Sequence, residues 1–160
     1  MTTTLFPTTP LTKAERDVAA LVATGLGPHT IAARRRLAPS TVKKRLHTLR
    51  SKLHCPGAPH HVLVHAVLSA GQALTPPAPR PAPDVSPDQA RLWRALAVHR
   101  LAPDIGQAAG IAPSAVKKRT AQLLTAVGAR DLTHLVILGH AWGQLTAENP
   151  APVHASGGDR

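Results

Sequence analysis

The clearest hydrophobic pattern in the chain runs from Ala38 to Leu53, APSTVKKRLHTLRSKL. Its large apolar side chains recur at helical spacing and share one face of a helix: Val42, Leu46, Leu49 and Leu53. Polar and cationic side chains occupy the opposite face: Ser40, Lys43, Lys44, His47, Arg50 and Ser51. The pattern predicts an amphipathic helix that buries one face in a core. The other face is suited to a polyanion such as DNA, although a solvated surface helix has the same pattern.

Three further helices are predicted around this one. The first begins at Thr12, a good N-cap with Glu15 at the capping-box spacing, and ends near Gly25. A short helix is predicted over 29–36, and a fourth over about 60–70. This fourth helix is apolar on more than one side, so we expect a second surface to cover it.

A Pro-rich segment and an internal repeat divide the chain. Residues 71–84 contain five prolines and predict an extended linker that reaches about 3 Å per residue. Beyond it, the sequence APSAVKKR at 112–119 repeats APSTVKKR at 38–45 after a shift of 74 residues. With the same shift, residues 11–67 match 85–141 at twelve identical positions, and the apolar period is kept. The repeat predicts a duplicated four-helix unit.

We therefore predict an all-α fold with two tandem four-helix units and a Pro-rich linker. The expected organisation is a flexible arm at 1–10, a first unit at 11–70, the linker at 71–84, a second unit at 85–144 and a disordered tail at 145–160. The two units could pack together as a pseudo-dimer, or the linker could hold them apart as beads.

Charge and aromatic content narrow the expected partner. Nineteen Lys and Arg residues against eight Asp and Glu residues give a formal net charge of +11, which favours nucleic acid or an anionic surface. The chain has one Phe, two Trp and no Tyr, too few for the stacking platforms that bind single strands. Duplex DNA is thus the better expectation. Residues 11–67 hold ten cations and two acids, whereas 85–141 hold seven and three, so the first unit should dominate the electrostatics.

Other classes of protein are disfavoured by what the sequence lacks. A single cysteine excludes an intramolecular disulfide, no apolar run approaches the ~20 residues of a membrane helix, and we see no signal peptide. We expect a cytoplasmic, nucleoid-associated protein with no membrane partner. No catalytic constellation or phosphate-cradling Gly-rich loop is present, so we expect neither an enzyme nor a cofactor.

The ten histidines raise a metal hypothesis. His61 and His65 are four residues apart on one predicted helix, with His60 and Cys55 nearby. No second Cys or His pair has zinc-finger spacing, so we predict no metal site. A DNA affinity that depends on pH is the alternative use of these side chains.

An ordered set of residues at the start of the chain forms a longer motif: Leu11, Thr12, Glu15, Val18, Leu21, Ala23, Gly25, Ile31, Ala32, Leu37, Thr41, Val42, Lys43, Leu49, Lys52 and Leu53. In order and spacing these residues resemble the LuxR-type (GerE-like) helix-turn-helix domain of bacterial transcription regulators, over about residues 11–70. The family has Ser at the position of Ala38 and His at the position of Arg45. These departures should weaken the helix cap and strengthen phosphate contact, respectively. The second unit resembles the family more faintly, through Val85, Ser86, Ile105, Val116, Lys117, Leu123 and Gly128.

The resemblance implies that the third helix of each unit enters the major groove. We expect Lys43, Lys44 and His47 to contact bases, because they point furthest outward. The other expected DNA-binding residues of the first unit, mostly phosphate contacts, are Ser40, Thr41, Arg45, Arg50, Arg34, Arg35 and Arg36. In the second unit they are Ser114, Lys117, Lys118 and Arg119, with Lys117 and Lys118 in the reading role.

The sequence thus predicts a transcription regulator that reads double-stranded DNA with two recognition helices and has no fused sensor domain. Because LuxR-type domains commonly dimerise through the fourth helix, the resemblance implies a pseudo-dimer within the chain or a homodimer. Two alternatives stay open. One is a DNA-bound adaptor whose second unit, with Leu124 exposed, contacts a protein such as RNA polymerase. The other is a DNA-binding protein for plasmid, phage or chromosome-end maintenance.

Overall fold

The structure is a computed structural model that describes residues 10–145, and within this range it is all-helical, without a strand. The expected all-α fold is therefore confirmed. The expected arm and tail lie outside the described residues, apart from Pro10 and Leu145. The helices are α1 (Lys13–Ala23), α2 (Pro28–Arg35), α3 (Pro39–Lys52), α4 (His60–Ser69), α5 (Pro87–Val98), α6 (Ala102–Ala109), the 3₁₀ helix η1 (Pro113–Ala115), α7 (Val116–Val127) and α8 (Leu132–Ala141).

Local signals in the sequence set the helix ends. The capping box expected at Thr12 is present: its Oγ1 accepts a hydrogen bond from the Glu15 N–H at 3.2 Å, and a Glu15 carboxylate oxygen accepts from the Thr12 N–H at 2.9 Å. The short helix α2 ends one residue earlier than predicted. Arg36 lies beyond its last residue, in the left-handed region with φ 55°, where it caps the helix.

The N-terminal half of the chain, α1–α4, packs around the apolar face of α3. Val42, Leu46 and Leu49 are buried against α1 and α2, as the pattern predicted, and Leu53 is half-buried against the same core. The helix can bury Val42, Leu46 and Leu49 because no charged side chain interrupts the stripe.

The C-terminal half, α5–α8, packs around Trp93, which is 1% exposed. Its indole N–H donates a hydrogen bond to the Leu135 carbonyl at 2.9 Å, so the one polar group of this buried ring is satisfied. Gly139 on α8 makes room for the ring, because a Cβ at that position would lie 2.8 Å from Trp93 Nε1. The expectation that Trp93 fills the core is confirmed.

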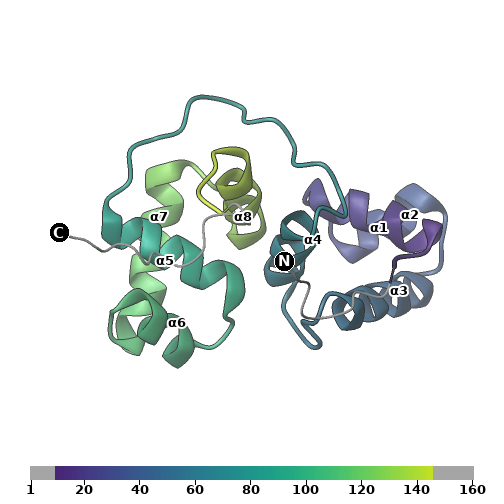
Figure 1. The fold of residues 1–160 in the computed structure, drawn as a ribbon, viewed down its shortest axis with the longest axis horizontal. Helices are drawn as coiled ribbons and strands as arrows, with labels where there is room; N and C mark the ends of the chain where they lie inside the picture. Colours follow the sequence, from purple (N-terminus) through teal and green to yellow (C-terminus); the bar gives the residue numbers. More distant parts are fainter. Residues whose placement is uncertain (1–9, 146–160) are drawn as a thin grey trace, which may run out of the picture.

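The two halves are packed together, with α4 lying against α1, α5 and α8 (Figure 1). The second surface expected for the apolar α4 is therefore supplied by α5 and α8, which helps to bury its large aliphatic side chains: Val62, Leu63, Val64, Val67 and Leu68. The segment between α4 and α5 does not hold the halves apart.

The end of this linker is fastened to the C-terminal half. Arg80 Nη2 donates to the Val127 carbonyl at 2.5 Å, and the Arg80 carbonyl accepts from the Trp142 indole N–H at 2.8 Å. The Arg80 guanidinium also lies 5.4 Å from the centre of the Trp142 ring. Leu145, which the sequence assigned to the tail, is instead buried in this core, and its N–H donates to the Gly139 carbonyl at 3.1 Å.

Candidate nucleic-acid interface

The outward face of α3 carries four exposed residues of the predicted DNA-binding set: Ser40, Lys43, Lys44 and His47. The helix begins with Pro39 in its first turn, where the missing N–H needs no partner. Ala38 supplies no side-chain cap, as expected from the sequence. Buried aliphatic side chains on the inner face fix the rotation of the helix, so the two lysines and His47 must face outward.

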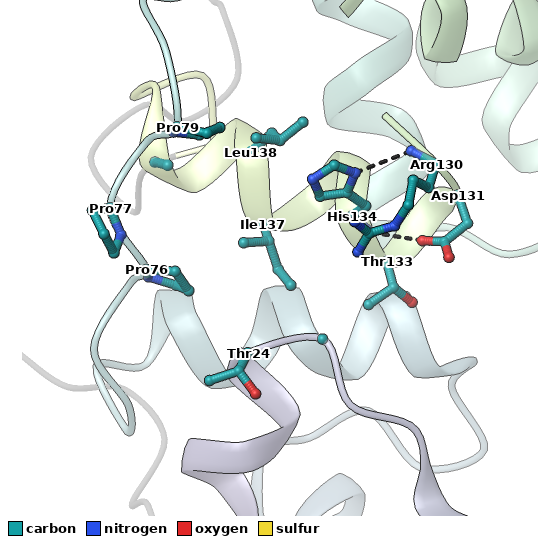
Figure 2. A pocket seen from close by; sticks show the side chains of 12 residues that line it. Thr24, Pro76, Pro77, Pro79, Arg130, Asp131, Thr133, His134, Ile137 and Leu138 are labelled. Atoms are coloured by element: carbon teal, nitrogen blue, oxygen red, sulfur yellow. Dashed lines mark hydrogen bonds between the residues drawn. The ribbon is translucent and has the colours of Figure 1, made fainter. Parts of the chain in front are cut away.

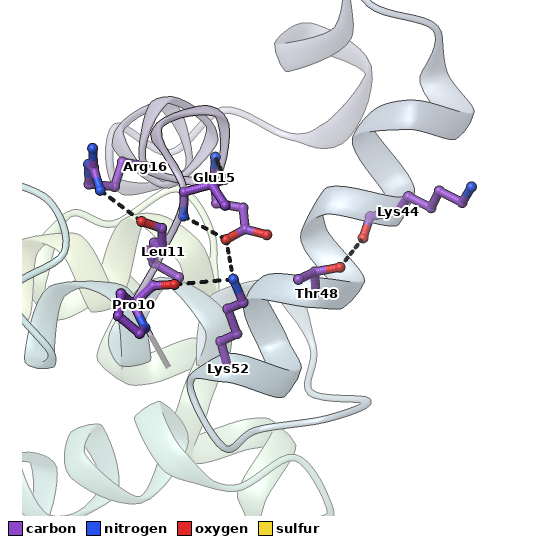
Figure 3. A network of polar contacts seen from close by, with 8 residues as sticks. Pro10, Leu11, Glu15, Arg16, Lys44, Thr48 and Lys52 are labelled. Atoms are coloured by element: carbon purple, nitrogen blue, oxygen red, sulfur yellow. Dashed lines mark hydrogen bonds and ion pairs between the residues drawn. The ribbon is translucent and has the colours of Figure 1, made fainter. Parts of the chain in front are cut away.

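The far end of α3 is tied to α1. Lys52 Nζ lies 2.7 Å from a Glu15 carboxylate oxygen and 3.2 Å from the Pro10 carbonyl (Figure 3). The hydrogen bond from Lys52 is the main cause that lowers the pKa of Glu15, followed by the bond from the Thr12 backbone. Figure 3 shows Lys44 extending away from this network. Among residues 10–145, neither Lys43 nor Lys44 forms an ion pair, so both charges remain available to an anionic ligand.

The arginines expected to hold phosphates divide into two groups. Arg34 is exposed on α2, and Arg45 is half-buried on α3, as is its neighbour Thr41. By contrast, Arg50 Nε donates to the Ala58 carbonyl at 2.7 Å, which fixes the turn before α4. Two other arginines also have structural roles in the N-terminal half. Arg35 forms an exposed ion pair with Asp17 at 3.0 Å, and Arg36 caps α2.

The corresponding segment of the C-terminal half begins with η1 and continues as α7. Ser114, Lys117, Lys118 and Arg119 are all exposed there, as the sequence predicted. The expectation that Leu124 is exposed is wrong, because this side chain is half-buried and packs against the core. A shallow hollow lies on the outer face of α7 and is lined by Lys118, Ala121, Gln122, Thr125 and Ala126.

A second hollow lies where the end of α1, the linker and α8 meet (Figure 2). Ile137 points from α8 toward Thr24 and forms the apolar wall. The polar groups at its rim are used to begin α8: Asp131 Oδ1 accepts from the His134 N–H at 2.8 Å, and His134 Nδ1 accepts from the Arg130 N–H at 3.0 Å. Burial and then the charge of Arg130 lower the pKa of His134. The hollow therefore lies at the contact between the halves and offers a ligand few free polar groups.

The histidines do not assemble a metal site in the part of the chain that the structure describes. Within residues 10–145, no three His, Cys, Asp or Glu side chains gather as potential metal ligands. In the same range, no helix is both long and apolar enough to cross a lipid bilayer.

Comparisons with known protein families, with curated proteins and with solved structures find no match for this chain. The likeness to the LuxR-type domain therefore depends on the motif residues given above.

Proposed function

We propose that this chain is a sequence-specific, double-stranded DNA-binding transcription regulator of the LuxR type, with two recognition segments, α3 and η1–α7. The observation that carries the proposal is the outer face of α3. Lys43, Lys44 and His47 are exposed there without a described acidic partner, on a helix whose inner face is buried. Lysine suits both the acceptor atoms of guanine in the major groove and the phosphate backbone.

Backbone features that recur 74 residues apart support two related units. Each unit opens with a capping box, places a left-handed residue before and after its recognition segment, and enters that segment through an alanine with φ −65° and ψ 144°. The matching pairs are Thr12 with Ser86, Arg36 with Gly110, His54 with Gly128, and Ala38 with Ala112. These pairs are informative because two of them keep the left-handed conformation although only one member is glycine.

The packing of α4 against α8 supports an intramolecular pseudo-dimer. Two hollows are lined by residues of both halves, one including Thr24 and Asp131 and the other including Val98 and Gly57. Val98 follows Thr24, and Asp131 follows Gly57, by the same 74 residues. Each hollow thus contains the repeat counterparts of residues in the other hollow. This is expected if a two-fold axis relates the halves, because a two-fold rotation would place one hollow on the other. The recognition segments α3 and α7 lie on either side of the α4–α8 pair (Figure 1).

In this arrangement one chain would read two unequal half-sites. The recognition helix of a helix-turn-helix protein places its first turns against base edges, and paired helices read half-sites about one DNA turn apart. In α7, the positions of His47 and Arg50 are Ala121 and Leu124, so the second half-site should contribute less. The expected difference between the half-sites follows from the different exposed side chains of α3 and α7.

The first test is selection of duplexes from a random pool, followed by a salt titration of the best site. We expect an asymmetric site with two half-sites and a log–log salt slope of about −0.9 for each phosphate neutralised. Failure to enrich any sequence, with only weak and uniform binding, would overturn the proposal of sequence-specific reading.

Charge-matched substitutions then assign the contribution of each recognition segment. Lys44→Ala should weaken binding to the selected site by about tenfold to a hundredfold, because a good base contact contributes ~1–3 kcal/mol. Lys118→Ala should cause a smaller loss that is confined to one half-site. Lys13→Ala, at the exposed start of α1, removes the same charge outside both segments and serves as the control.

One observation favours a second candidate, the adaptor. The outer face of α7 carries the shallow hollow, with small side chains at Ala121 and Ala126 where a DNA-reading helix would present polar ones. In the adaptor hypothesis this face contacts a protein such as RNA polymerase, while α3 holds DNA. Enrichment of a single short half-site, together with unchanged affinity in Lys118→Ala, would favour the adaptor over the two-segment reader.

A further inference from the structure

Two histidine side chains face each other across the contact between the halves. His65 on α4 and His140 on α8 are half-buried, with His65 Nδ1 2.9 Å from His140 Nε2 and ring centres 5.0 Å apart. The Ser69 hydroxyl lies 3.5 Å from His65 Nδ1 and 3.4 Å from its Nε2. The pair thus joins the two helices that hold the halves together.

The number of protons that this geometry accepts is limited. A hydrogen bond between two imidazoles needs an N–H on one facing nitrogen and a lone pair on the other, so the rings can share a bond while they hold at most one extra proton between them. A second extra proton would leave two N–H donors and two like charges facing each other. Burial lowers the pKa of both rings, and burial followed by the neighbouring His65 lowers that of His140 to about 4.

No described carboxylate raises the pKa of His65 or His140, whereas Asp131, the N-cap of α8, acts to raise the pKa of His60 and His134. The α4 and α8 helices contain no acid, and their other titratable groups are His60, His61 and His134. The neighbouring α1 contributes Lys13, Glu15, Arg16 and Asp17, of which the two acids are paired with Lys52 and Arg35. The neighbouring α5 contributes Asp88, Arg91 and Arg94. The α7 helix, which packs on α8, contributes Lys117, Lys118 and Arg119.

Two other histidines of α4, His60 and His61, also have lowered pKa values. Burial lowers the pKa of His61, although a hydrogen bond to the Leu96 backbone on α5 acts in the opposite direction. Burial also lowers the pKa of His60, whose Nε2 lies 3.1 Å from the Leu26 carbonyl within the N-terminal half. His61 contacts the C-terminal half through Leu96, so its protonation also opposes the packed state. For His60, the charge of Asp131 in the C-terminal half acts in the opposite direction and raises the pKa.

We propose that the His65–His140 pair makes the packing of α4 against α8 sensitive to acid, so that the halves separate as the pH falls while their helices stay folded. Combined with the proposed function, on which this second step rests, acidification would convert a reader of two half-sites into a reader of one. The pair then regulates the length of the DNA site without touching DNA.

The size of the effect follows from proton linkage. In separated halves both rings are solvated and take up protons near the ordinary histidine pKa of about 6.5, whereas the packed state excludes at least one of these protons. The contribution of the pair to packing is therefore complete above about pH 6.5. Below that pH, the ratio of packed to separated molecules falls about tenfold for each pH unit. At pH ~5 we expect a shift of about 30-fold toward the separated state.

The first experiment measures packing without DNA. Small-angle X-ray scattering of the full chain between pH ~7.5 and pH ~5 should show a rise in the radius of gyration, while far-UV circular dichroism keeps the helical signal. The double variant His65→Gln, His140→Gln retains neutral hydrogen-bonding groups and should lose most of this rise. The control His29→Gln, at an exposed position on α2, should respond like the unmodified chain.

Three outcomes would overturn the proposal: no expansion of the unmodified chain, the same expansion in the double variant, or loss of helical signal in step with expansion. Substitution could also disturb folding, so nuclear magnetic resonance of the histidine ring protons gives a second reading on the unmodified chain. We expect two imidazoles with lowered pKa values whose titration coincides with the expansion, and titration of every histidine near its ordinary pKa would also contradict the proposal.

The second experiment compares affinity for a duplex with both selected half-sites and for one with a single half-site. The affinity for two half-sites, divided by the affinity for one, should decrease in the unmodified chain as the pH is lowered. In the double variant this ratio should stay constant. Taking the ratio removes any effect of His47 on DNA, because α3 contacts both duplexes. If no duplex is bound specifically at pH ~7.5, the proposed function fails, while the scattering experiment still decides whether the pair controls packing.

Discussion

The helix α3 and the segment η1–α7 have similar backbone conformations at their ends but carry different side chains on both faces. On the inner face, Leu46 is buried, whereas its counterpart Thr120 places a buried hydroxyl without a described hydrogen-bond partner in the same position. On the outer face, His47 is replaced by Ala121. The difference shows that a few aliphatic positions suffice to hold the helix in place, while the exposed side chains can differ between the two segments.

The two halves also reach their stability in different ways. The N-terminal half ties α1 to α3 through the ion pair of Glu15 and Lys52. The C-terminal half has Gln89 and Ala126 at these positions, so this ion pair is absent there. It has instead Trp93 where the N-terminal half has Ala19, and thus buries a much larger apolar side chain.

Removal of Trp93 should have the largest effect on this comparison. Trp93→Ala leaves a cavity beside Gly139 and frees the Leu135 carbonyl, so we expect the free energy of unfolding to fall by about 3–5 kcal/mol. Urea unfolding followed by circular dichroism measures the change. Trp142→Phe, at a half-exposed position, is the matched control and should cost less. A loss below about 1 kcal/mol for Trp93→Ala would mean that this ring does not organise the C-terminal half.

Replacement of the buried hydroxyl should bring α7 closer to α3 in stability. Thr120→Val keeps the shape of the side chain and removes a polar group that lacks a described partner, so we expect a gain of about 1 kcal/mol. The comparison variant is Thr48→Val, whose hydroxyl donates to the Lys44 carbonyl at 3.1 Å. Thermal unfolding of both variants should show a gain for the first and a small loss for the second. Equal effects would indicate that the Thr120 hydroxyl is satisfied in solution.

The smallest effect should come from making the N-terminal half resemble the C-terminal half at its ion pair. Glu15→Gln keeps a capping-box side chain, as Gln89 does in α5, and should lower the free energy of unfolding by about 0.5–1 kcal/mol near neutral pH. Because the pKa of Glu15 is lowered in the folded chain, its contribution is complete above its ordinary pKa of about 4.3 and is lost as the pH falls through the lowered value.

Urea unfolding at several pH values checks this dependence, and Lys52→Met completes a double-mutant cycle. A difference between the unmodified chain and Glu15→Gln that persists at pH ~2 would assign the loss to the cap and not to the charge.

Sequence patterns predicted the helices and much of the core, because these features depend on neighbours in the chain. The stripe Val42, Leu46 and Leu49 follows from helical spacing, and the capping box at Thr12 follows from residues three apart. The exposure of Lys43 and Lys44 was predictable for the same reason, since the buried stripe fixes the opposite face.

Contacts between distant residues were not predictable from these patterns. The bond from Arg50 to Ala58 and the ion pair of Arg35 with Asp17 depend on how turns and helices meet, which periodicity does not encode. The burial of Leu124 was missed because the repeat aligned it with the polar Arg50. The facing of His65 and His140 depends on how α4 and α8 pack, so only His65 drew notice in the sequence, as a metal candidate.

The anchored linker affects how the occupancy of a DNA site would depend on the concentration of the protein. Arg80 anchors the linker to Val127 and Trp142 of the C-terminal half, which shortens the segment that joins this half to α4. The two halves therefore meet at an effective concentration set by the chain and not by the solution. Two separate copies that must first meet would occupy a site in proportion to the square of their concentration. A chain that carries both recognition segments, as proposed, would respond in direct proportion and would bind at concentrations too low for two molecules to associate.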